Sequence, residues 1–558
     1  MRIAGTLALG LLAATPTAAQ TPRSMAGLPL AVVEGYGATV PFAEHEAEAA
    51  TFTGRLIGPD RAFGTLAAEA SGRRAVLLDE IDQSVTFVVD APADAITVRY
   101  AVPDAKTCRD GDARIGVHAE GRRIADLPLT PCFSWYYGAY PFSHDGGEDG
   151  HHAFDHVRLR FDRRLAAGAT VSLRFARATR ADWVVVDLAN FETVPAAPPP
   201  PEGALSVLDL GADPTGMRDS RHAIQTALDQ GRREQRPVWL PEGVYRVDGH
   251  LIVDRVRLIG AGPWRSVLTG DGVGVYGLPA PEGSSEVVLR DFAIIGQVMD
   301  RDDHAQLNGV GGALNRSRIE GLFIQHTKAG VWLDGPMDDV TVRGLRILDQ
   351  AADGLNFHGG ATRVVVEDTF VRNTGDDGLA AWSHPTPNSG LVYRRNTVIA
   401  PVLANGIAIY GGRDIEVTGN LVADTLTRGG GLHLGARFDA TPVEGTVRFD
   451  GNLLARTGSL DPVWGFGVGA IWLYALDRPI DADIRITNTL VMDSTDAALM
   501  TLGKAIRGLG VEDISVSGGT GLLTVRSPGQ ARMSGVTAET PGVEIHDPGF
   551  VLDPSPAP

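Results

Sequence analysis

The stretch that decides the fold runs from Asp353 to Trp382, beginning Asp-Gly-Leu-Asn-Phe-His and ending Asn-Thr-Gly-Asp-Asp-Gly-Leu-Ala-Ala-Trp. Its opening Asp353-Gly354-Leu355 returns 24 residues later as Asp377-Gly378-Leu379. The same pattern continues on both sides, as Gly330-Val331-Trp332, Asn405-Gly406-Ile407 and Gly430-Gly431-Leu432. A repeat of roughly 20–30 residues that contains short β-type runs is typical of a solenoid, in which each coil stacks on the one before.

The repeat also predicts which side chains meet. In a stack of coils, equivalent positions lie one strand spacing apart, about 4.7–4.9 Å. Asp353 is therefore expected directly against Asp377, with Asp376 beside them. Three crowded carboxylates carry an electrostatic cost that a purely structural turn would seldom keep. The apolar residue after each glycine, from Val331 to Leu432, has the character that a solenoid core requires and is assigned no chemistry.

The chain before the repeat predicts a separate all-β domain over residues 25–194. Alternating β runs such as 85–89, 157–161 and 171–175 are separated by turn formers at the spacing of a sandwich. This domain resembles the galactose-binding-like sandwiches of carbohydrate-binding modules. A proline-rich linker over residues 195–203 follows, and residues 204–545 are expected to form the solenoid.

The start of the solenoid contains a short amphipathic segment. Ser220 or Asp219 is expected to cap a helix that turns Ala223, Ile224, Ala227 and Leu228 inward. The segment resembles the opening of pectate-lyase-like right-handed parallel β-helices, where a helix covers the end of the stack. The predicted fold class is therefore all-β, a right-handed parallel β-helix of about ten coils preceded by a β-sandwich. Residues 458–464 are expected to form a projecting loop, and residues 546–558 a disordered tail.

Composition limits the location and the partners of the protein. Residues 1–19 have the basic start and short apolar run of an export signal, and no later run is long enough to span a bilayer. We expect a secreted or periplasmic monomer with no membrane span. The net charge of −18 argues against nucleic acid and polyanionic partners and is compatible with a neutral polysaccharide. Cys108 and Cys132, the two cysteines, are predicted to form a disulfide in an oxidising compartment.

Two further N-terminal features have a structural and a functional interpretation. The aromatic residues between Trp135 and Phe142 can stack on sugar rings, but a packed loop is the favoured interpretation. The acidic run from Asp145 to His152 can hold a structural calcium ion, although a solvated turn fits its spacing better. No cofactor is predicted to be required, and no metal ligands are assigned.

The crowded acids favour hydrolysis of a glycosidic bond. That reaction needs one protonated carboxyl to donate to the leaving oxygen and one ionised group to act on the sugar or on water. Asp353 and Asp377 are predicted to hold a water molecule between them, and Asp376 to serve as the acid. A water between base and sugar implies inversion, with acid and base roughly 6.5–9.5 Å apart. The predicted substrate-binding residues are polar and aromatic side chains on the same coils: Asn356, His358, Trp382, Asn405, Tyr410 and His433.

At this point the sequence resembles a known family. The run from Arg372 to Ser383, with the preceding Ala352-Asp353-Gly354, is similar to the catalytic core of glycoside hydrolase family 87. That family contains α-1,3-glucanases and mycodextranases in which a β-sandwich precedes a right-handed β-helix. The resemblance implies inverting hydrolysis of an α-1,3-linked or mixed α-1,3/α-1,4 glucan. It also implies that Asp376 is the acid and that Asp353 and Asp377 activate water.

Three other functions are compatible with a β-helix. Polygalacturonase-like enzymes also place Gly-Asp-Asp on a β-helix, but their Gly-His-Gly and Arg-Ile-Lys motifs are not matched by the later coils around His433 and Arg437. A lyase acting on a uronate polymer would need bridging calcium and a basic residue in the cleft. A non-catalytic carbohydrate-binding protein or adhesin on a β-helix stalk would leave the aspartates as turn residues.

Overall fold

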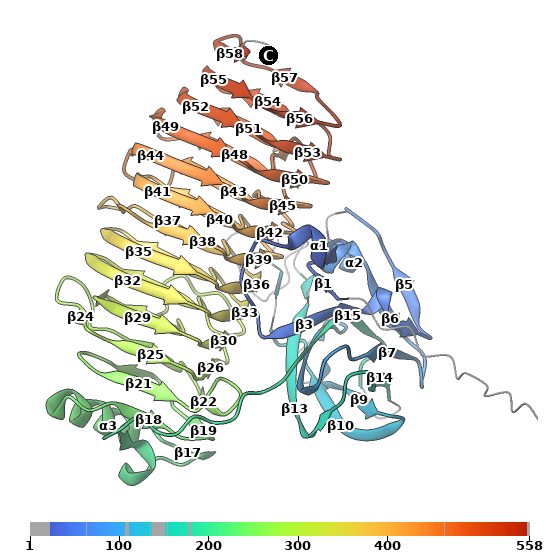
Figure 1. Ribbon diagram of the computed structural model, residues 1–558, viewed down its shortest axis with the longest axis vertical. Helices are drawn as coiled ribbons and strands as arrows, with labels where there is room; N and C mark the ends of the chain where they lie inside the picture. The colour runs from blue at the N-terminus through green and yellow to red at the C-terminus, as the bar shows by residue number, and fades with distance from the viewer. Residues whose placement is uncertain are drawn as a thin grey trace, which may run out of the picture.

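The computed structural model describes residues 23–62, 64–105, 111–133, 135–136, 151–152, 154–176, 180–461 and 464–554. An antiparallel β-sandwich is followed by a long parallel β-solenoid, and the sandwich lies against one side of the solenoid near the middle of its length (Figure 1). The predicted fold class is therefore confirmed. In the described part of the chain, no helix is both long enough and apolar enough to cross a membrane.

The sandwich has two antiparallel sheets that enclose an apolar core. One sheet contains β1 (Ser24–Met25), β2 (Leu28–Pro29), β3 (Phe42–Glu46), β5 (Arg55–Ile57), β6 (Ala75–Leu78), β8 (Ala93–Ala101), β13 (Asp155–Leu165) and β15 (Val184–Glu192). The other contains β4 (Thr51–Phe52), β7 (Ser84–Val88), β9 (Ala113–Ala119), β10 (Arg122–Leu129) and β14 (Thr170–Phe175). Alternate residues of β14 are buried, as expected for a strand with one face on a core.

Short elements complete the sandwich. They are the helices α1 (Leu30–Val33) and α2 (Leu66–Glu69), the 3₁₀ turns η1 (Ala47–Ala49) and η2 (Ser71–Arg73), and the paired strands β11 (Trp135–Tyr136) and β12 (His151–His152).

The solenoid is built from three parallel sheets, one strand of each sheet per coil. Sheet 1 contains β16 (Leu205–Ser206), β18 (Val238–Leu240), β21 (Arg257–Gly260), β25 (Val288–Arg290), β29 (Ser317–Glu320), β32 (Met337–Arg343), β35 (Ala361–Glu367), β38 (Val392–Arg394), β41 (Gly412–Thr418), β44 (Val443–Asp450), β49 (Ile480–Thr487), β52 (Ile506–Glu512), β55 (Gly529–Ser534) and β58 (Phe550–Pro554).

Sheet 2 contains β17 (Thr215–Asp219), β19 (Gly243–Arg246), β22 (Ser266–Thr269), β26 (Ala293–Ile295), β30 (Phe323–Gln325), β33 (Arg346–Gln350), β36 (Phe370–Thr374), β39 (Thr397–Ile399), β42 (Leu421–Ala423), β45 (Leu453–Ala455), β50 (Leu490–Met492), β53 (Ser515–Ser517) and β56 (Thr537–Ala538). Sheet 3 contains β20 (His250–Ile252), β23 (Gly274–Tyr276), β27 (Val310–Gly312), β31 (Val331–Asp334), β34 (Leu355–His358), β37 (Leu379–Trp382), β40 (Ile407–Tyr410), β43 (Leu432–Ala436), β48 (Ile471–Ala475), β51 (Leu499–Gly503), β54 (Leu523–Arg526) and β57 (Val543–Ile545).

The register that the repeat predicts is confirmed. Leu355 of β34 pairs with Leu379 of β37, and Leu379 pairs with Ile407 of β40. The backbone N–H of Gly354 donates to the carbonyl oxygen of Asp377 at 3.0 Å, so Asp353 and Asp377 occupy equivalent places on adjacent coils. The apolar residues after the glycines are fully buried in the solenoid core.

The ends of the solenoid agree with the sequence only in part. Helix α3 (Arg221–Glu234) buries Ile224, Ala227 and Leu228 at one end of the stack (Figure 1). Ser220 precedes the helix, but its hydroxyl accepts the Asp213 N–H instead of capping α3. At the other end, the prediction of a disordered tail over 546–558 is wrong for β58, because its backbone pairs with β55 and extends sheet 1. The stack is also longer than ten coils, since sheets 1, 2 and 3 have 14, 13 and 12 strands among the described residues.

The sandwich covers the outer face of sheet 2. Phe42 of β3 packs edge-on against Phe370 of β36, with ring centroids 5.2 Å apart. Met25 and Leu28 lie in the same apolar cluster as the outward side chains of sheet 2. The sandwich is thus attached to the solenoid by a buried interface and not only through the connector after residue 195.

Several predicted features fall outside the described residues. They are the export signal at 1–19, Cys108, the side chains of the aromatic cluster at 135–142 and the acidic segment at 145–150. The disulfide between Cys108 and Cys132 therefore stays a prediction, as does the calcium site. The expected projecting loop is a short hairpin of β46 (Ser459–Asp461) and β47 (Phe466–Val468).

Candidate active site

A cleft of about 700 Å³ lies on the outer face of sheet 3, beside its junction with sheet 2. It contains all three predicted catalytic aspartates and five of the six predicted substrate-binding residues. The lining residues are Arg301, Asp303, Gln306, Asn308, Lys328, Trp332, Asp334, Ala352, Asp353, Asn356, His358, Asp376, Asp377, Trp382, Leu403, Ala404, Asn405, Tyr410, Arg428, Arg437 and Phe438.

The aspartates lie on two adjacent turns that lead from sheet 2 into sheet 3. Asp353 follows β33 and precedes β34, whereas Asp376 and Asp377 lie between β36 and β37. The second turn is held locally, because the Thr374 hydroxyl donates to the carbonyl oxygen of Asp376 at 2.7 Å. The Asp377 N–H donates to Asp376 Oδ1 at 3.0 Å.

Glycine is required in both turns by the closeness of the coils. A Cβ atom at Gly354 would lie 2.3 Å from the carbonyl oxygen of Gly378. A Cβ atom at Gly378 would lie 2.2 Å from a methyl group of Val398. Real Cβ atoms do not approach other atoms so closely, so the glycines of the repeat permit the stacking that brings the aspartates together.

One carboxylate oxygen from each of Asp353, Asp376 and Asp377 lies within 4.8 Å of the others. The predicted separation of acid and base, roughly 6.5–9.5 Å, is therefore not found between these atoms. Asp353 and Asp377 are 6 % and 4 % exposed, whereas the side chain of Asp376 is 25 % exposed. Asp377 is heavily hydrogen-bonded, since it accepts the backbone and side-chain N–H groups of Asn405 at 2.8 and 2.9 Å and the Tyr410 hydroxyl at 2.9 Å. Asp353 accepts the Asn356 side-chain amide at 3.1 Å.

Burial and mutual repulsion keep protons in this cluster. Burial raises the pKa of Asp353 well above its ordinary value, and the charges of Asp376 and Asp377 raise it further. Burial and the neighbouring Asp376 raise the pKa of Asp377 to about 7, although its donors Asn405 and Tyr410 act in the opposite direction. Near neutral pH the cluster therefore contains both protonated and ionised carboxyls, as acid–base catalysis requires.

A cationic loop closes one side of the cluster. Arg301, between β26 and β27, donates from Nη2 to Asp376 Oδ2 at 2.8 Å and from Nε to Asp303 Oδ1 at 2.7 Å. Lys328 secures the same loop by donating to the backbone carbonyl oxygens of Asp303 and Ala305. Although burial lowers the pKa of Arg301, the carboxylates of Asp376 and Asp303 raise it above the ordinary value, so Arg301 is charged.

Aromatic rings form the floor beside the acids. His358 stacks on Trp382 with centroids 4.6 Å apart, and Trp382 stacks on His384 at 5.2 Å. Trp332 lies on the other side of His358 at 5.9 Å. His358 Nδ1 lies 2.9 Å from Asp334 Oδ1, which fixes the orientation of the ring. This row of flat, partly exposed faces is the type of surface on which sugar rings stack.

His433 corrects the predicted set of substrate-binding residues. Its side chain is fully buried, stacked on Trp472 at 4.1 Å with Nδ1 3.1 Å from the Trp472 carbonyl oxygen. Tyr410 covers it from the other side. It does not line the cleft, because the rings on the adjacent coils close over it.

Sequence reasoning missed the cations of the cleft and the loop at 296–309 that brings Arg301 to Asp376. A signal was present in the charged run Asp300-Arg301-Asp302-Asp303, which interrupts the β-type pattern shortly before the acidic coils. Phe438 and Arg437 were also missed as cleft residues. Phe438 follows β43, and its carbonyl oxygen accepts the Trp382 indole N–H at 3.0 Å.

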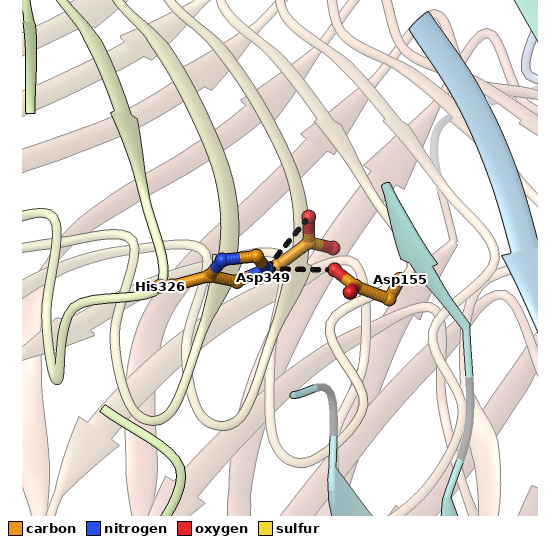
Figure 2. Close-up of side chains that lie close together, drawn as sticks. All are labelled: Asp155, His326 and Asp349. Carbon is orange, nitrogen blue, oxygen red and sulfur yellow. Dashed lines mark hydrogen bonds and ion pairs between the residues drawn. The ribbon is translucent and has the colours of Figure 1, made fainter. Parts of the chain in front are cut away.

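Two groups of side chains have the spacing of a metal site among the described residues. In Asp353, Asp376 and Asp377, the guanidinium of Arg301 already supplies the positive charge. In the second group, Asp155, His326 and Asp349, the carboxylate oxygens accept protein donors on both aspartates (Figure 2). Neither group therefore offers a cation a set of uncommitted oxygens.

Comparisons with known proteins agree with this geometry. Family models described as α-1,3-glucanase catalytic domains D1 and D2 match residues 39–194 and 218–518. The catalytic unit of a thermostable GH87 α-1,3-glucanase from Streptomyces thermodiastaticus strain HF3-3 is 39 % identical, with a TM-score of 0.85 over 92 % of this chain and 96 % of that one. The Agl-KA catalytic domain is 20 % identical and shares the fold, with a TM-score of 0.84 over 93 % of this chain and 99 % of its own.

A curated relative outside that family matches a smaller part. Mannuronan C5-epimerase AlgE4 from Azotobacter vinelandii is 28 % identical over 195 residues, which span 32 % of this chain and 32 % of the epimerase. The family models, by contrast, match most of the chain and include both the sandwich and the solenoid. The chain belongs to the α-1,3-glucanases of glycoside hydrolase family 87 and is a glycoside hydrolase.

Proposed function

We propose that this protein hydrolyses an α-1,3-linked glucan, or a glucan with mixed α-1,3 and α-1,4 linkages, with inversion at the anomeric carbon. The observation that carries the proposal is the meeting of Asp353, Asp376 and Asp377 within 4.8 Å in a cleft whose floor is a row of rings. Asp376 is the general acid, and Asp353 and Asp377 activate the attacking water. This assignment keeps the roles that the family resemblance implies.

The burial of the three carboxylates supports this division of roles. Asp376 is the most exposed of them, so its carboxyl reaches the open cleft in which a glycosidic oxygen would lie. Asp353 and Asp377 lie deeper, on adjacent coils, and the attacking water is assigned to the position between them. The close contact among the carboxylates lets a proton held by the buried pair pass to Asp376 when substrate displaces Arg301 from it.

Asn405 and Tyr410 are proposed to act mainly through Asp377, because both donate hydrogen bonds to that carboxylate. His358 and Trp382 are proposed to hold sugar rings, because their stacked faces are partly exposed in the cleft. Asn356 donates to Asp353 and is proposed to fix that carboxylate while facing the substrate. Sugar binding and orientation of the acids are therefore assigned to neighbouring positions on the same group of coils.

The cations in the cleft do not favour a uronate polymer. Arg301 is paired with Asp303 and Asp376, and Lys328 is bound to two backbone carbonyls. Arg437 lies over the ring of Phe438, 4.0 Å from its centroid. Arg301 and Lys328 are therefore engaged by the protein itself, so two of the four Arg and Lys side chains that line the cleft are already committed and not available to successive uronates.

Export fits the proposed substrate. A glucan polymer does not cross a membrane, so an enzyme that cleaves it must act where the polymer is. The basic start and apolar run of residues 1–19 are the feature of the sequence that would direct the protein out of the cytoplasm. We therefore propose secretion or periplasmic residence of a monomer.

The function is tested by incubating the protein with α-1,3-glucan, β-glucans and uronate polymers and measuring new reducing ends. We expect release from α-1,3-glucan or the mixed-linkage α-glucan only, with first products of β configuration in the proton NMR spectrum. Ultraviolet absorbance from an unsaturated uronate product would contradict the proposal. Products that retain the α configuration would contradict inversion and would agree with carboxylates closer than the roughly 6.5–9.5 Å typical of inverting enzymes.

The pH dependence should respond to the Tyr410 hydroxyl. This hydroxyl donates to Asp377 and lowers the pKa of that carboxyl, so Tyr410→Phe raises the pKa above about 7. Because the base must be ionised, the acidic limb of the kcat/KM profile should move upward by up to about one pH unit. Tyr393→Phe is the matched control, since that buried hydroxyl donates to the carbonyl oxygen of Ala380. An unchanged acidic limb in Tyr410→Phe would remove Asp377 from the role of base.

A further inference from the structure

The coils of sheet 2 bend at one equivalent position, and the residues there adopt left-handed backbone angles. We call this set the bend row: His326 (φ 55°), Asp349 (φ 54°), Asn373 (φ 65°), Ala400 (φ 51°), Asp424 (φ 57°), Arg456 (φ 52°) and Asp493 (φ 50°). The pairing of adjacent strands places these residues one above another along the stack. Non-glycine residues rarely adopt this conformation, which costs roughly 1–2 kcal/mol and persists where surrounding contacts impose it.

The sandwich supplies those contacts on most of the row. Asp155 of β13 accepts from His326 at 2.8 Å (Figure 2), and the next residue, His156, contacts Asp349 through its ring at 2.7 Å and its backbone N–H at 3.2 Å. Asn373 donates to the carbonyl oxygen of Phe154 at 2.6 Å and accepts from Arg99 at 3.2 Å. Three consecutive residues of the sandwich, 154–156, thus bind three consecutive coils.

Further along the stack the same pattern continues. Arg456 donates to the carbonyl oxygen of Ala26, and Asp493 pairs with Arg61. The sandwich therefore binds the bend row from His326 to Asp493 and not at a single coil. The contacts at His326, Asp349 and Asn373 come from β13, the residue before it and Arg99 of β8. The contacts at Arg456 and Asp493 come from segments near the N-terminus of the described chain.

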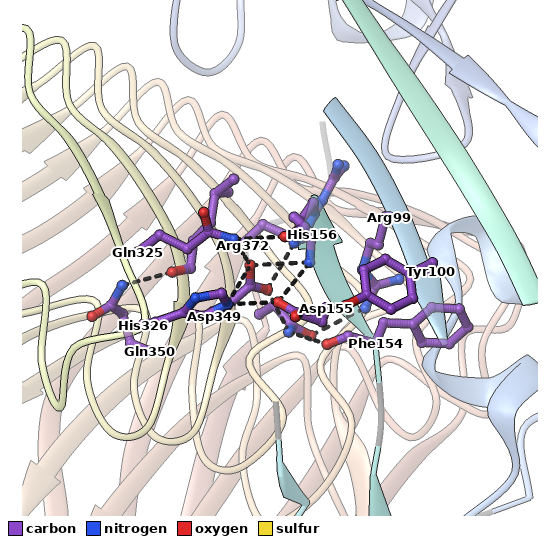
Figure 3. A network of polar contacts seen from close by, with 12 residues as sticks. Arg99, Tyr100, Phe154, Asp155, His156, Gln325, His326, Asp349, Gln350 and Arg372 are labelled. Carbon is purple, nitrogen blue, oxygen red and sulfur yellow. Dashed lines mark hydrogen bonds and ion pairs between the residues drawn. The ribbon is translucent and has the colours of Figure 1, made fainter. Parts of the chain in front are cut away.

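Asp349 belongs to one buried network of polar contacts (Figure 3), and Asn373 joins it through its hydrogen bond to Asp349. Asp349 also accepts the side-chain amides of Gln325 and Asn373, each at 2.8 Å. Although burial alone would raise it, the charge and hydrogen bonds of His156 hold the pKa of Asp349 below its ordinary value. A carboxylate with so many donors is fixed in one orientation, and so is the bend that carries it.

Arg372, the residue before Asn373, is also bound by the sandwich. The guanidinium of Arg372 forms two hydrogen bonds with Glu44 of β3, at 2.8 and 3.1 Å, and both side chains are almost fully buried. Arg372 and Asn373 are therefore fixed by the sandwich on the strand that leads into the catalytic turn. After them come only Thr374 and Gly375 before Asp376.

The bends bound most extensively are the ones that precede the catalytic acids. Asp349 lies four residues before Asp353, and Asn373 lies three before Asp376 and four before Asp377. Both bends belong to sheet 2, which the sandwich covers, and both turns open into sheet 3, which forms the cleft. The backbone direction at the bend sets the direction of the turn, because only a few residues separate them.

We propose that the sandwich positions the catalytic aspartates, by holding the bends at Asp349 and Asn373 from which the two acidic turns leave sheet 2. The inference rests on the proposed catalytic role of Asp353, Asp376 and Asp377. Asp349 and Asn373 are positioning residues, since they touch the sandwich and not the cleft. Displacements of about 1 Å in a catalytic group can lower the rate by 10²-fold, so loss of these contacts is expected to affect turnover.

The test replaces Asn373 by glycine. Glycine adopts the left-handed bend without strain, so Asn373→Gly removes the sandwich bonds to Phe154 and Arg99, together with the bond to Asp349, and leaves the backbone free to keep its path. We expect kcat on α-1,3-glucan to fall 10- to 100-fold, KM to stay within threefold, and the pH profile to shift as the carboxylates move relative to one another. Near-ultraviolet circular dichroism checks that the fold is intact.

Asp493→Gly is the matched control, because it removes a sandwich contact from the same row at a coil remote from the acids. It should keep kcat within twofold. If Asn373→Gly fails to fold, Asp349→Asn replaces it, since asparagine keeps the shape and tolerates the bend; kcat should then fall about three- to tenfold. Wild-type turnover in the folded variant, or equal losses in Asp493→Gly, would overturn the inference. Activity of Asp376→Asn would instead overturn the proposed function, so the two failures are distinguishable.

Discussion

Asp376→Asn is expected to lower kcat on α-1,3-glucan by roughly 10²–10⁴-fold, the contribution of a general acid to such a reaction. The amide cannot donate the proton that the leaving oxygen needs. The fold should be unaffected, because the Asp376 side chain is the most exposed of the three and its carboxamide can still accept a bond from Arg301. The measurement is steady-state release of reducing ends, with thermal unfolding as the check on folding.

The chemistry of the leaving group separates the acid from the base. The fluoride ion of an α-glucosyl fluoride of the right linkage leaves without protonation. The Asp376→Asn enzyme should therefore hydrolyse this substrate at a rate close to that of the wild type. Asp377→Asn is the comparison, because the loss of a base is not repaired by a better leaving group. The reverse pattern, with Asp377→Asn active on the fluoride and Asp376→Asn inactive, would exchange the two roles.

Glu44→Ala is expected to destabilise the protein by about 3–5 kcal/mol, because it leaves the buried guanidinium of Arg372 without its partner. Arg372 is 0 % exposed and Glu44 is 1 % exposed, so water cannot replace the lost carboxylate. The measurement is the urea concentration at the midpoint of unfolding, followed by circular dichroism. A midpoint equal to that of the wild type would show that the pair does not hold the sandwich to the solenoid.

Two control variants test whether the unpaired buried charge causes the loss of stability. Glu444→Ala disrupts an exposed pair with Arg413 at 4.0 Å, which should change stability by less than about 1 kcal/mol. The double variant Glu44→Ala with Arg372→Met removes both buried charges and should recover much of the loss, because the penalty comes from the unpaired charge. If the double variant does not regain stability, the loss in Glu44→Ala is caused by altered packing and not by the unpaired charge.

The spacing of the repeat was sufficient to place Asp353 against Asp377, because a solenoid converts sequence separation into spatial contact in a regular way. The rings of His358 and Trp382 followed from the same register. His433 shows the limit of that reasoning, since the register fixes a position on a coil but not whether a neighbouring ring covers it. Arg301 lies in a loop outside the repeat, so no column of the sequence points to its contact with Asp376.

The position of the sandwich was the least accessible feature. The sequence predicts the strands of the sandwich, and the sandwich resembles sugar-binding modules. That resemblance suggests binding of a sugar and gives no indication of the interface with the solenoid. Bonds such as those from His156 to Asp349 join residues that are 193 positions apart. No local pattern encodes such a pairing, because it depends on how two separately folded surfaces fit.

A stack of coils in which each layer touches only its neighbours can open from either end, one layer at a time. The sandwich contacts the layers from His326 to Asp493 together. Separating one of these layers from its neighbour therefore also requires breaking contacts between the solenoid and the sandwich. At the α3 end the sandwich also reaches the first coils, since Arg160 pairs with Glu242 and Arg158 donates to the carbonyl oxygen of Pro263. Among the described residues, the layers near β58 lie beyond the last of these contacts, at Asp493 and Thr495, and can fray independently (Figure 1). The catalytic layers therefore lie in the segment that stays closed while the layers near β58 open and close.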